Sequence, residues 1–298
     1  MKILNFGSLN LDFVYRVPHF IRPGETVSSL DYAQFCGGKG LNQSIALSNA
    51  GADVYHAGII GNGGKILKDT LEKYNVNTDF IAVKDCMNGH AIIQVDDNGQ
   101  NCIMLYGGSN QAVTTGYVDS VLEHFGSDDI IVLQNEINAL DYIIASAHKR
   151  GIRIALNPSP AGKNLNDIPL EYVRWFLLNE IEGFELTGQN EPQKILDTLL
   201  SRYPDSAIVL TLGKAGAVYK DAHTYEKHGV YNVPVKDTTA AGDTFTGYFI
   251  ACIAQGLPVK VALEKASVAS SFAVSKSGAA ASIPLRAEVD NHNFEMLN

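Results

Sequence analysis

The sequence lacks the features that mark secreted or membrane-bound proteins. Its 298 residues include only four cysteines, which lie far apart and form no C-x-x-C pair. Such spacing favours buried free thiols over a disulfide framework or a zinc site. No apolar run approaches the roughly 18 residues that a membrane-spanning helix needs, and the opening MKILNFGSLNLDF is too polar for a secretory signal. We therefore expect a cytoplasmic protein with no membrane partner.

Positive charge is also scarce. The chain has 23 Lys and Arg against 32 Asp and Glu, for a formal net charge of -9. Because nucleic acids are bound through an excess of Lys and Arg, we expect no nucleic-acid partner. The chain also contains neither a G-x-x-x-x-G-K-[ST] loop nor a G-x-G-x-x-G turn. A P-loop enzyme is thereby excluded, and a dinucleotide oxidoreductase loses its main support.

What the sequence does contain is a regular alternation of short apolar runs and amphipathic segments. Strand-like runs occupy residues 3–6, 54–60, 130–133, 153–156, 176–178 and 208–212, and helical patterns occupy 65–74, 140–150, 193–203, 241–255 and 259–274. Runs that are apolar at nearly every position suit strands buried on both faces. The pattern predicts an α/β fold, with a central, mostly parallel sheet flanked by helices.

Two stretches interrupt this alternation. Residues 25–35 read as a strand with no helix before it, and residues 91–106 read as a hairpin around Asn98-Gly99. We expect these stretches to pair into a small second sheet, a lid formed by about residues 12–36 and 90–107. The chain, residues 1–298, is otherwise expected to form a single domain.

The most informative motif is DTTAAGDTF, residues 237–245. It follows a strand-like stretch at 231–235 and opens the helix predicted from residue 241. Unpaired N–H groups at a helix N-terminus attract anions, and small residues let the backbone approach a ligand. Asp243 alone would be explained equally well as a complement to the helix dipole. A carboxylate inside an anion-binding turn instead indicates a base beside a phosphate.

A second motif, GGKGLN at residues 37–42, precedes another predicted helix. Its glycines allow backbone N–H groups, Lys39 and Asn42 to reach one polar ligand. A purely structural tight turn is the alternative, and it explains the lysine less well.

With these motifs the chain resembles the ribokinase family, also called the PfkB carbohydrate kinases, over essentially its whole length. The two signatures of that family correspond to residues 37–42 and 237–245. Further matches follow in family order at residues 7–12 (GSLNLD), 157–158 (NP), 179–182 (NEIE) and 211–216 (TLGKAG).

The resemblance implies an ATP-dependent kinase that phosphorylates the terminal hydroxymethyl group of a small sugar, D-ribose being the best single expectation. It assigns the general base to Asp243 and the anion hole to the backbone amides of Ala240, Ala241 and Gly242. It places the sugar against Asn10, Asp12, Gly38, Lys39, Asn42 and Glu136, with Asp12 at the carboxyl edge after the first strand. It places ATP and Mg²⁺ against Asn179, Glu182, Thr211, Gly213, Gly216 and Gly242.

The resemblance further implies a K⁺ ion beside the signature loop, held by Asp237, Thr239, Ala273, Lys276, Gly278 and Ser282. We also expect a homodimer, because a small sheet that is apolar on both faces needs a cover beyond its own chain. One departure concerns residues 61–64 (GNGG), where family members commonly carry acids in the turn. It leaves open another small sugar, a sugar acid or a nucleoside as substrate. A catalytically silent sugar sensor would have lost Asp243, which is present.

Overall fold

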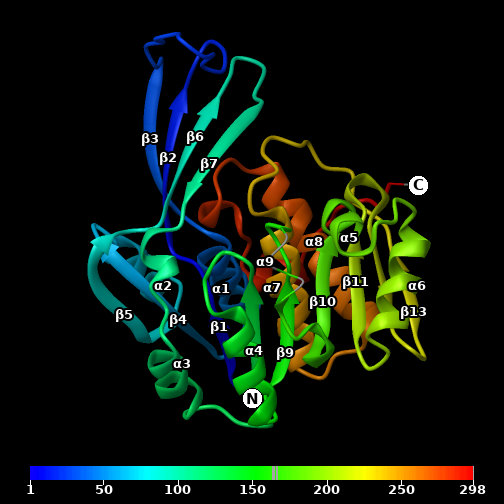
Figure 1. Cartoon of the computed structure of the whole chain (residues 1–298). Helices are drawn as coiled ribbons and strands as arrows, with labels where there is room; N and C mark the ends of the chain where they lie inside the picture. The colour runs from blue at the N-terminus through cyan, green and yellow to red at the C-terminus, as the bar shows by residue number, and fades with distance from the viewer. Residues whose placement is uncertain (163–164, 166, 298) are drawn as a thin grey trace.

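The computed structural model describes residues 1–162, 165 and 167–297 and is organised around two sheets (Figure 1). Sheet A is the larger and has nine strands. Its strands are parallel except at one end, where β12 and β13 are antiparallel to their neighbours. Across sheet A the order is β13 (Tyr225–His228), β12 (Ala217–Lys220), β11 (Ala207–Thr211), β10 (Val173–Asn179), β9 (Arg153–Asn157), β8 (Ile130–Gln134), β1 (Ile3–Phe6), β4 (Val54–Asn62) and β5 (Asn77–Met87).

Helices cover both faces of sheet A, which explains why its strands are apolar throughout. Successive residues of a strand point to opposite faces, so Ile3 packs in one core cluster and Leu4 in the other. The Ile3 face carries α1 (Lys39–Asn49), α2 (Lys65–Lys73), α7 (Ala241–Ala254), α8 (Val259–Ser275) and α9 (Arg286–Asp290). The Leu4 face carries α3 (Thr115–Leu122), α4 (Leu140–Lys149) and α6 (Pro192–Arg202), and α5 (Glu180–Thr187) follows β10.

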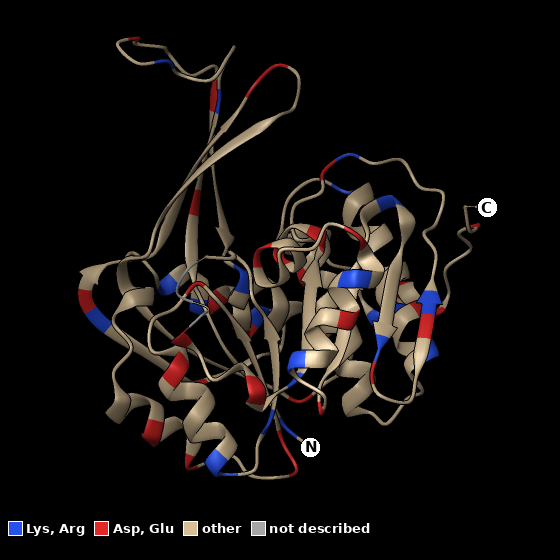
Figure 2. Cartoon of the chain, turned by 45° about the vertical axis from the view of Figure 1, so that its right-hand side comes forward, with Lys and Arg blue, Asp and Glu red and all other residues tan. Residues whose placement is uncertain are grey.

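Sheet B is small and projects from the carboxyl edge of sheet A (Figure 1). Its order is β3 (Asp31–Gly37), β2 (Asn10–Arg16), β6 (His90–Val95) and β7 (Asn101–Tyr106). The β2–β6 pair is parallel and the two outer pairs are antiparallel. Strands β6 and β7 contain no charged Lys, Arg, Asp or Glu, as Figure 2 shows.

The α/β fold with a mostly parallel sheet is confirmed, and each of the six strand-like runs corresponds to a strand of sheet A, with Leu212 just beyond the end of β11. Two local expectations are wrong. Residues 231–235 form no strand, and only Tyr231 makes a bridge, to Met296. The strand expected at 25–35 begins only at Asp31, and the Glu25 N–H closes a turn onto the Arg22 carbonyl.

The two stretches expected to pair with each other are also not neighbours in sheet B. Strand β2 lies between them, and it carries Asp12. The expectation that Asp12 follows the first strand at its carboxyl edge is therefore wrong. Strand β1 ends at Phe6, and the chain crosses to sheet B within three residues.

Candidate active site

The N-terminus of α7 presents unpaired backbone donors beside a buried carboxylate. Ala240 caps the helix in the left-handed conformation, with φ 60°, and Asp243 occupies the first turn with 7% of its surface exposed. The Ala241 N–H donates to the Thr238 carbonyl at 3.3 Å, so it is not free as expected. The N–H groups of Ala240, Gly242 and Asp243 have no acceptor within the described part of the chain. Such a terminus binds anions.

Helix α1 supplies the partners of the Asp243 carboxylate. Asn42 Nδ2 donates to Oδ2 at 3.1 Å, and Gln43 Nε2 donates to Oδ1 at 2.9 Å. The other amide atom of Asn42, Oδ1, is buried and has no hydrogen-bond partner among the described residues. An unpaired buried acceptor is costly unless a ligand supplies a donor. The structure thus brings Asn42 and Asp243 together and leaves Asn42 Oδ1 as an unpaired acceptor beside them.

The N-terminus of α1 is closed by a second acid. Glu136 accepts from the Ser8 hydroxyl and, at 3.0 Å, from the Lys39 backbone N–H. The Gly40 N–H donates to Ser8 Oγ at 3.2 Å. We expected the backbone donors of this glycine-rich turn to face a ligand, but those of Lys39 and Gly40 bind Glu136 and Ser8 instead. Negative charge at this position complements the helix dipole.

Two glycines make this junction possible. Gly38 has φ 94°, a conformation that side chains rarely adopt. A Cβ on Gly40 would lie 2.4 Å from the backbone nitrogen of Ser8. The glycine-rich motif therefore allows α1 to begin against the end of β1, where Lys39, Asn42 and Glu136 meet.

Opposed charges meet at the Lys39 ammonium. Burial lowers its pKa, but the carboxylates of Asp243, Glu136 and Glu182 outweigh burial, so the pKa lies above its ordinary value. Burial raises the pKa of Glu136, although Lys39 and the hydrogen bond from Ser8 act against that rise. The charged lysine therefore lies among three acids that come from different elements.

Asp12 approaches this group from sheet B. Its side chain lies directly against Gly37, where a Cβ would come within 1.9 Å of Asp12 Oδ2. Burial, followed by repulsion from Glu136, raises the pKa of Asp12 to about 7. Asn10, at the start of β2, is buried and accepts a 2.7 Å hydrogen bond from Asn110. Both residues are thus near the Glu136 end of the site, and they reach it from the second sheet.

Asn179 and Glu182 form the capping box of α5, at the carboxyl end of β10. Asn179 Oδ1 accepts from the Glu182 N–H at 3.0 Å, and Glu182 Oε2 accepts from the Asn179 N–H at 2.9 Å. The second carboxylate oxygen, Oε1, has no hydrogen-bond partner in the described ranges. A solvated helix start would leave Glu182 exposed, yet it is 6% exposed and interacts with Lys39.

Thr211, Gly213 and Gly216 lie at the carboxyl end of the neighbouring strand β11 and in the turn after it. Thr211 ends the strand, and residues 213–215 form a short 3₁₀ turn. The carboxyl edge of an open α/β sheet is where such folds bind ligands. The turn therefore lies one strand away from the capping box at Asn179.

Asp237 joins the turn before α7 to the turn after α8. Its Oδ1 accepts from the backbone and hydroxyl of Thr239, and its Oδ2 accepts from the Gly278 N–H at 3.0 Å. Burial raises the pKa of Asp237, but these hydrogen bonds outweigh burial and lower it overall. Within the described residues, the carbonyls of Thr239, Lys276 and Gly278 have no hydrogen-bond partner, whereas that of Ala273 accepts from Lys276.

Ser282 fits this group less directly. It is fully buried, and its hydroxyl donates to the Ala279 carbonyl at 2.8 Å. The oxygen of that hydroxyl still has lone pairs available. The candidate ligand atoms gathered here are all oxygens, which suits a hard cation or an alkali ion.

The turn at residues 61–64 is occupied by a neutral side chain. Asn88 Oδ1 accepts from the Gly61 N–H at 2.9 Å, and a Cβ on Gly64 would lie 2.3 Å from the same oxygen. Strand β4 continues through Asn62, and α2 starts directly after Gly64. An acid at Gly64 would therefore displace Asn88.

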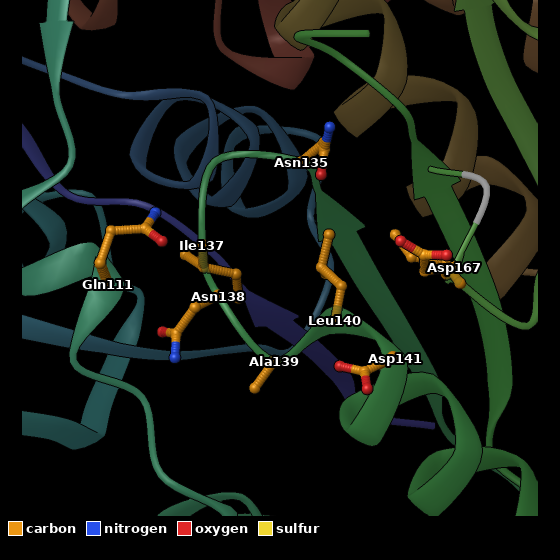
Figure 3. Close-up of a pocket in the computed structure, with 9 residues that line it drawn as sticks. Gln111, Asn135, Ile137, Asn138, Ala139, Leu140, Asp141 and Asp167 are labelled. Carbon is orange, nitrogen blue, oxygen red and sulfur yellow. The ribbon is translucent and has the colours of Figure 1, made fainter. Parts of the chain in front are cut away.

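A hollow of about 320 Å³ lies behind the Glu136 loop (Figure 3). In Figure 3, the segment from Asn135 to Asp141 runs between Gln111 on one side and Asp167 on the other. None of the site residues expected from the sequence lines this hollow. The unpaired backbone donors of α7 and the buried charges converge instead at Asp243.

The sequence reasoning missed several polar residues that support the site. The most important is Gln43, which contacts Asp243 directly. Its position was a usable signal, since it follows Lys39 by four residues and therefore lies on the same helix face. Others are Ser8, Gln134, Asn88 and Asn110, all buried.

Comparisons with known proteins match the chain to carbohydrate kinases over most of its length. The model of the pfkB family carbohydrate kinases matches residues 1–286. The ribokinase of Schizosaccharomyces pombe is 35% identical over 310 residues, covering 97% of each chain. The crystal structure of Cryptococcus neoformans ribokinase with ADP has a TM-score of 0.84 and 31% identity, covering 97% of this chain and 98% of that one. Arabidopsis thaliana ribokinase with ribose and ATP has a TM-score of 0.84 and 25% identity, covering 97% of each.

Proposed function

The chain belongs to the pfkB family of carbohydrate kinases, and on that premise we propose that it transfers the γ-phosphoryl group of ATP to D-ribose, giving ribose 5-phosphate and ADP. The observation that carries the proposal is the buried Asp243 carboxylate beside the unpaired N–H groups of α7. The fungal and plant relatives named ribokinase support ribose as the acceptor.

In the proposed step, Asp243 takes the proton of the hydroxymethyl oxygen as that oxygen bonds to the γ-phosphorus. The bond from the γ-phosphorus to the bridging oxygen breaks, and ADP leaves with its electron pair. Donors at Ala240, Gly242 and Asp243 stabilise the charge on the transferring group, and Ala241 shapes the turn although its own N–H is bonded. Such reactions depend mainly on positioning and charge.

We place the sugar among the polar groups of α1, β2 and the Glu136 loop. The acids Asp12 and Glu136 accept from sugar hydroxyls, and the unpaired Asn42 Oδ1 accepts from another. Lys39 donates to a ring or hydroxyl oxygen, while Asn10 and Gly38 shape the wall of the site. A site built to bond hydroxyls discriminates strongly against a sugar that lacks one.

For the nucleotide, we place the phosphates of ATP between α7 and the carboxyl ends of β10 and β11. Thr211, Gly213 and Gly216 supply the turn beneath the nucleotide. Glu182 Oε1 and Asn179 fit a water-bridged Mg²⁺, because one carboxylate oxygen is free and the capping box fixes the other. Bound Mg²⁺ supplies charge neutralisation on the phosphates.

A monovalent cation, K⁺, fits the oxygens around Asp237. Three of the carbonyls proposed for it (Thr239, Lys276 and Gly278) have no other partner among the described residues, and Ala273 and Ser282 complete the set. Asp237 already ties the turn before α7 to the turn after α8. An ion here would keep the backbone donors of α7 in place without touching the substrate.

Sheet B is proposed to act as a lid over the sugar and as the contact in a homodimer. Every residue of β7 is exposed, including Ile103, Met104 and Leu105. An exposed, uncharged edge strand favours pairing with a second copy. In the described part of the chain, no helix is both long and apolar enough to cross a membrane. A cytoplasmic location and the lack of a nucleic-acid partner remain our proposals.

The test is a panel of ribose, 2-deoxyribose, ketoses, a sugar acid and nucleosides, with ADP release as the coupled readout. We expect kcat/KM for ribose to exceed that for 2-deoxyribose, because Asp12 accepts from neighbouring hydroxyls. Equal values, or fast turnover of another substrate alone, would overturn the ribose assignment. Absence of any turnover with intact ATP and sugar binding would indicate a sensor instead.

A further inference from the structure

A row of fully buried polar side chains runs behind Asp243, away from the ligand space. We call it the buried amide row, and its members are Gln43, Gln134, Asn5, Ser44 and His56, each 0% exposed. They come from α1, β8, β1 and β4. Gln134 Nε2 donates to Gln43 Oε1 and to Asn5 Oδ1, each at 2.8 Å. Asn5 Nδ2 donates to Ser44 Oγ at 2.7 Å, and Ser44 Oγ lies 2.8 Å from His56 Nδ1.

The hydrogen bonds of this row diverge from Gln134, whose amide donates in two directions. Burial lowers the pKa of His56 to about 3, so its ring is neutral. Since Ser44 Oγ already accepts from Asn5, its own proton goes to His56 Nδ1. The amide of Gln134 gives a proton to Asn5 and a proton to Gln43. One branch therefore runs from Gln134 through Gln43 to Asp243, and the other runs through Asn5 and Ser44 to His56.

The hydrogen bonds to Asp243 and from Gln134 fix which way the Gln43 amide faces. If that amide turned over, its oxygen would meet an Asp243 carboxylate oxygen, and its NH₂ would meet the NH₂ of Gln134. Both contacts would be repulsive. The Gln134 amide is fixed as well, because turning it over would bring its oxygen against the acceptor oxygens of Asn5 and Gln43. Gln43 can thus only donate to Asp243.

We propose that Gln43, oriented by Gln134, is a positioning residue that holds Asp243 in the rotamer needed to accept the substrate proton. The bond from Gln43 occupies Oδ1. Oδ2, which also accepts from the Asn42 amide, is then the oxygen that faces the acceptor hydroxyl. The proposal rests on Asp243 being the general base. It explains why a row of amides is buried where apolar residues would cost less to bury.

The charged groups that interact with Asp243 are Lys39 and Glu136. We place both residues at the sugar, and neither is a member of the buried amide row. Hydrogen bonds to a carboxylate favour its ionised form. Removing the Gln43 donor should therefore move the acid side of the kcat–pH profile upward, which loss of packing alone would not do.

The experiment compares Gln43→Leu, which removes the donor, and Gln43→Glu, which replaces it with an acceptor, in the full chain. For Gln43→Leu we expect kcat to fall about 10- to 100-fold through lost positioning. The acid limb should rise by on the order of 1 pH unit, and by more in Gln43→Glu. The KM values for ATP and sugar should change by less than about threefold, because Gln43 is not proposed to contact either substrate.

Two further variants keep the result interpretable. Ser48→Ala is the matched control, because Ser48 lies on the same helix and its hydroxyl donates away from the site, to the Tyr74 carbonyl at 2.6 Å. It should leave the pH profile unchanged. Gln134→Leu keeps the Gln43 donor but removes the group that orients it, and a smaller shift in the same direction is expected. It serves as the test should Gln43→Leu fail to fold.

An unshifted acid limb in both the Gln43 and the Gln134 variants would overturn the proposal. So would a Gln43→Leu effect on kcat that is undiminished in the Asp243→Asn background, since the residue would then act independently of Asp243. The general-base role of Asp243 is tested separately: it would be refuted if the Asp243→Asn variant alone kept its turnover.

Discussion

Replacing Asp243 with asparagine removes the charge that we propose accepts the proton, while leaving the shape of the side chain. The new amide oxygen can keep the hydrogen bond from Gln43. Its NH₂ group would face the NH₂ of Asn42, but Asn42 can turn its amide over, because its Oδ1 has no partner to lose among the described residues. Both contacts survive as neutral hydrogen bonds. The structure thus predicts a folded protein without a base.

The two consequences differ in size. Exchanging two charge-assisted hydrogen bonds for neutral ones costs about 1–2 kcal/mol of unfolding free energy. For a chain of this size that lowers Tm by roughly 2–8 °C. Loss of a positioned general base lowers kcat by roughly 10²–10⁴, which corresponds to about 3–5.5 kcal/mol in the activation barrier. Turnover should therefore fall far more than stability.

The assay combines steady-state kinetics, a thermal melt and nucleotide-binding titration on wild type, Asp243→Asn and the control Ser48→Ala. We expect ATP affinity within about threefold of wild type, since the donors of α7 are backbone groups. Retention of more than about a tenth of wild-type kcat by Asp243→Asn would refute the role of Asp243, because loss of a general base lowers kcat by more than this. A melt showing an unfolded variant would refute the structural reasoning on Asn42 instead.

Four further outcomes can be checked. Because the pKa of Asp12 is about 7, its protonated form increases as pH falls below 7 and cannot accept from two hydroxyls; sugar KM should rise at pH 6 in wild type and stay flat in Asp12→Asn. The same raised pKa means that Asp12 costs stability as pH rises from about 4 to 7, so melts should show Asp12→Asn gaining on wild type over that range. K⁺ should raise kcat over tetramethylammonium at matched ionic strength, and Asp237→Ala should abolish that response; equal rates in wild type would remove the ion. Met104→Glu on β7 should shift the mass found by light scattering from dimer to monomer, and a wild-type monomer at micromolar concentration would exclude the dimer.

The sequence predicted the core of the fold because burial on both faces leaves a direct mark. Runs such as residues 130–133 have no polar position, and this is what strands between two helix layers require. Strand β2 was missed because its residues, NLDFVYR, alternate only partly and belong to a sheet that is largely exposed. Its partners lie far away in sequence, and no local pattern records them.

The site shows the same division. Motif spacing identified Asp243, Lys39 and Asn42, which meet through two adjacent helices. It could not show that Glu136 caps α1, since that contact spans 97 residues of sequence. Nor could it show which side chains stand behind Asp243. Buried amides such as Gln134 have no periodicity of their own, so their roles emerge only from the packing of α1 against β8 and α7.

The parallel pairing of β2 with β6 also bears on the order in which the chain can fold. Leu11 pairs with His90, so the hairpin of β2 and β3 cannot gain its second neighbour until the segment that builds β4, α2 and β5 has been made. At typical rates of synthesis, the delay from the end of β3 to the end of β6 is roughly 3–12 s. Throughout that interval β2 has an open edge that includes Phe13 and Val14. An open apolar edge on a nascent chain is a site for mispairing, and it is closed here only when β6 arrives.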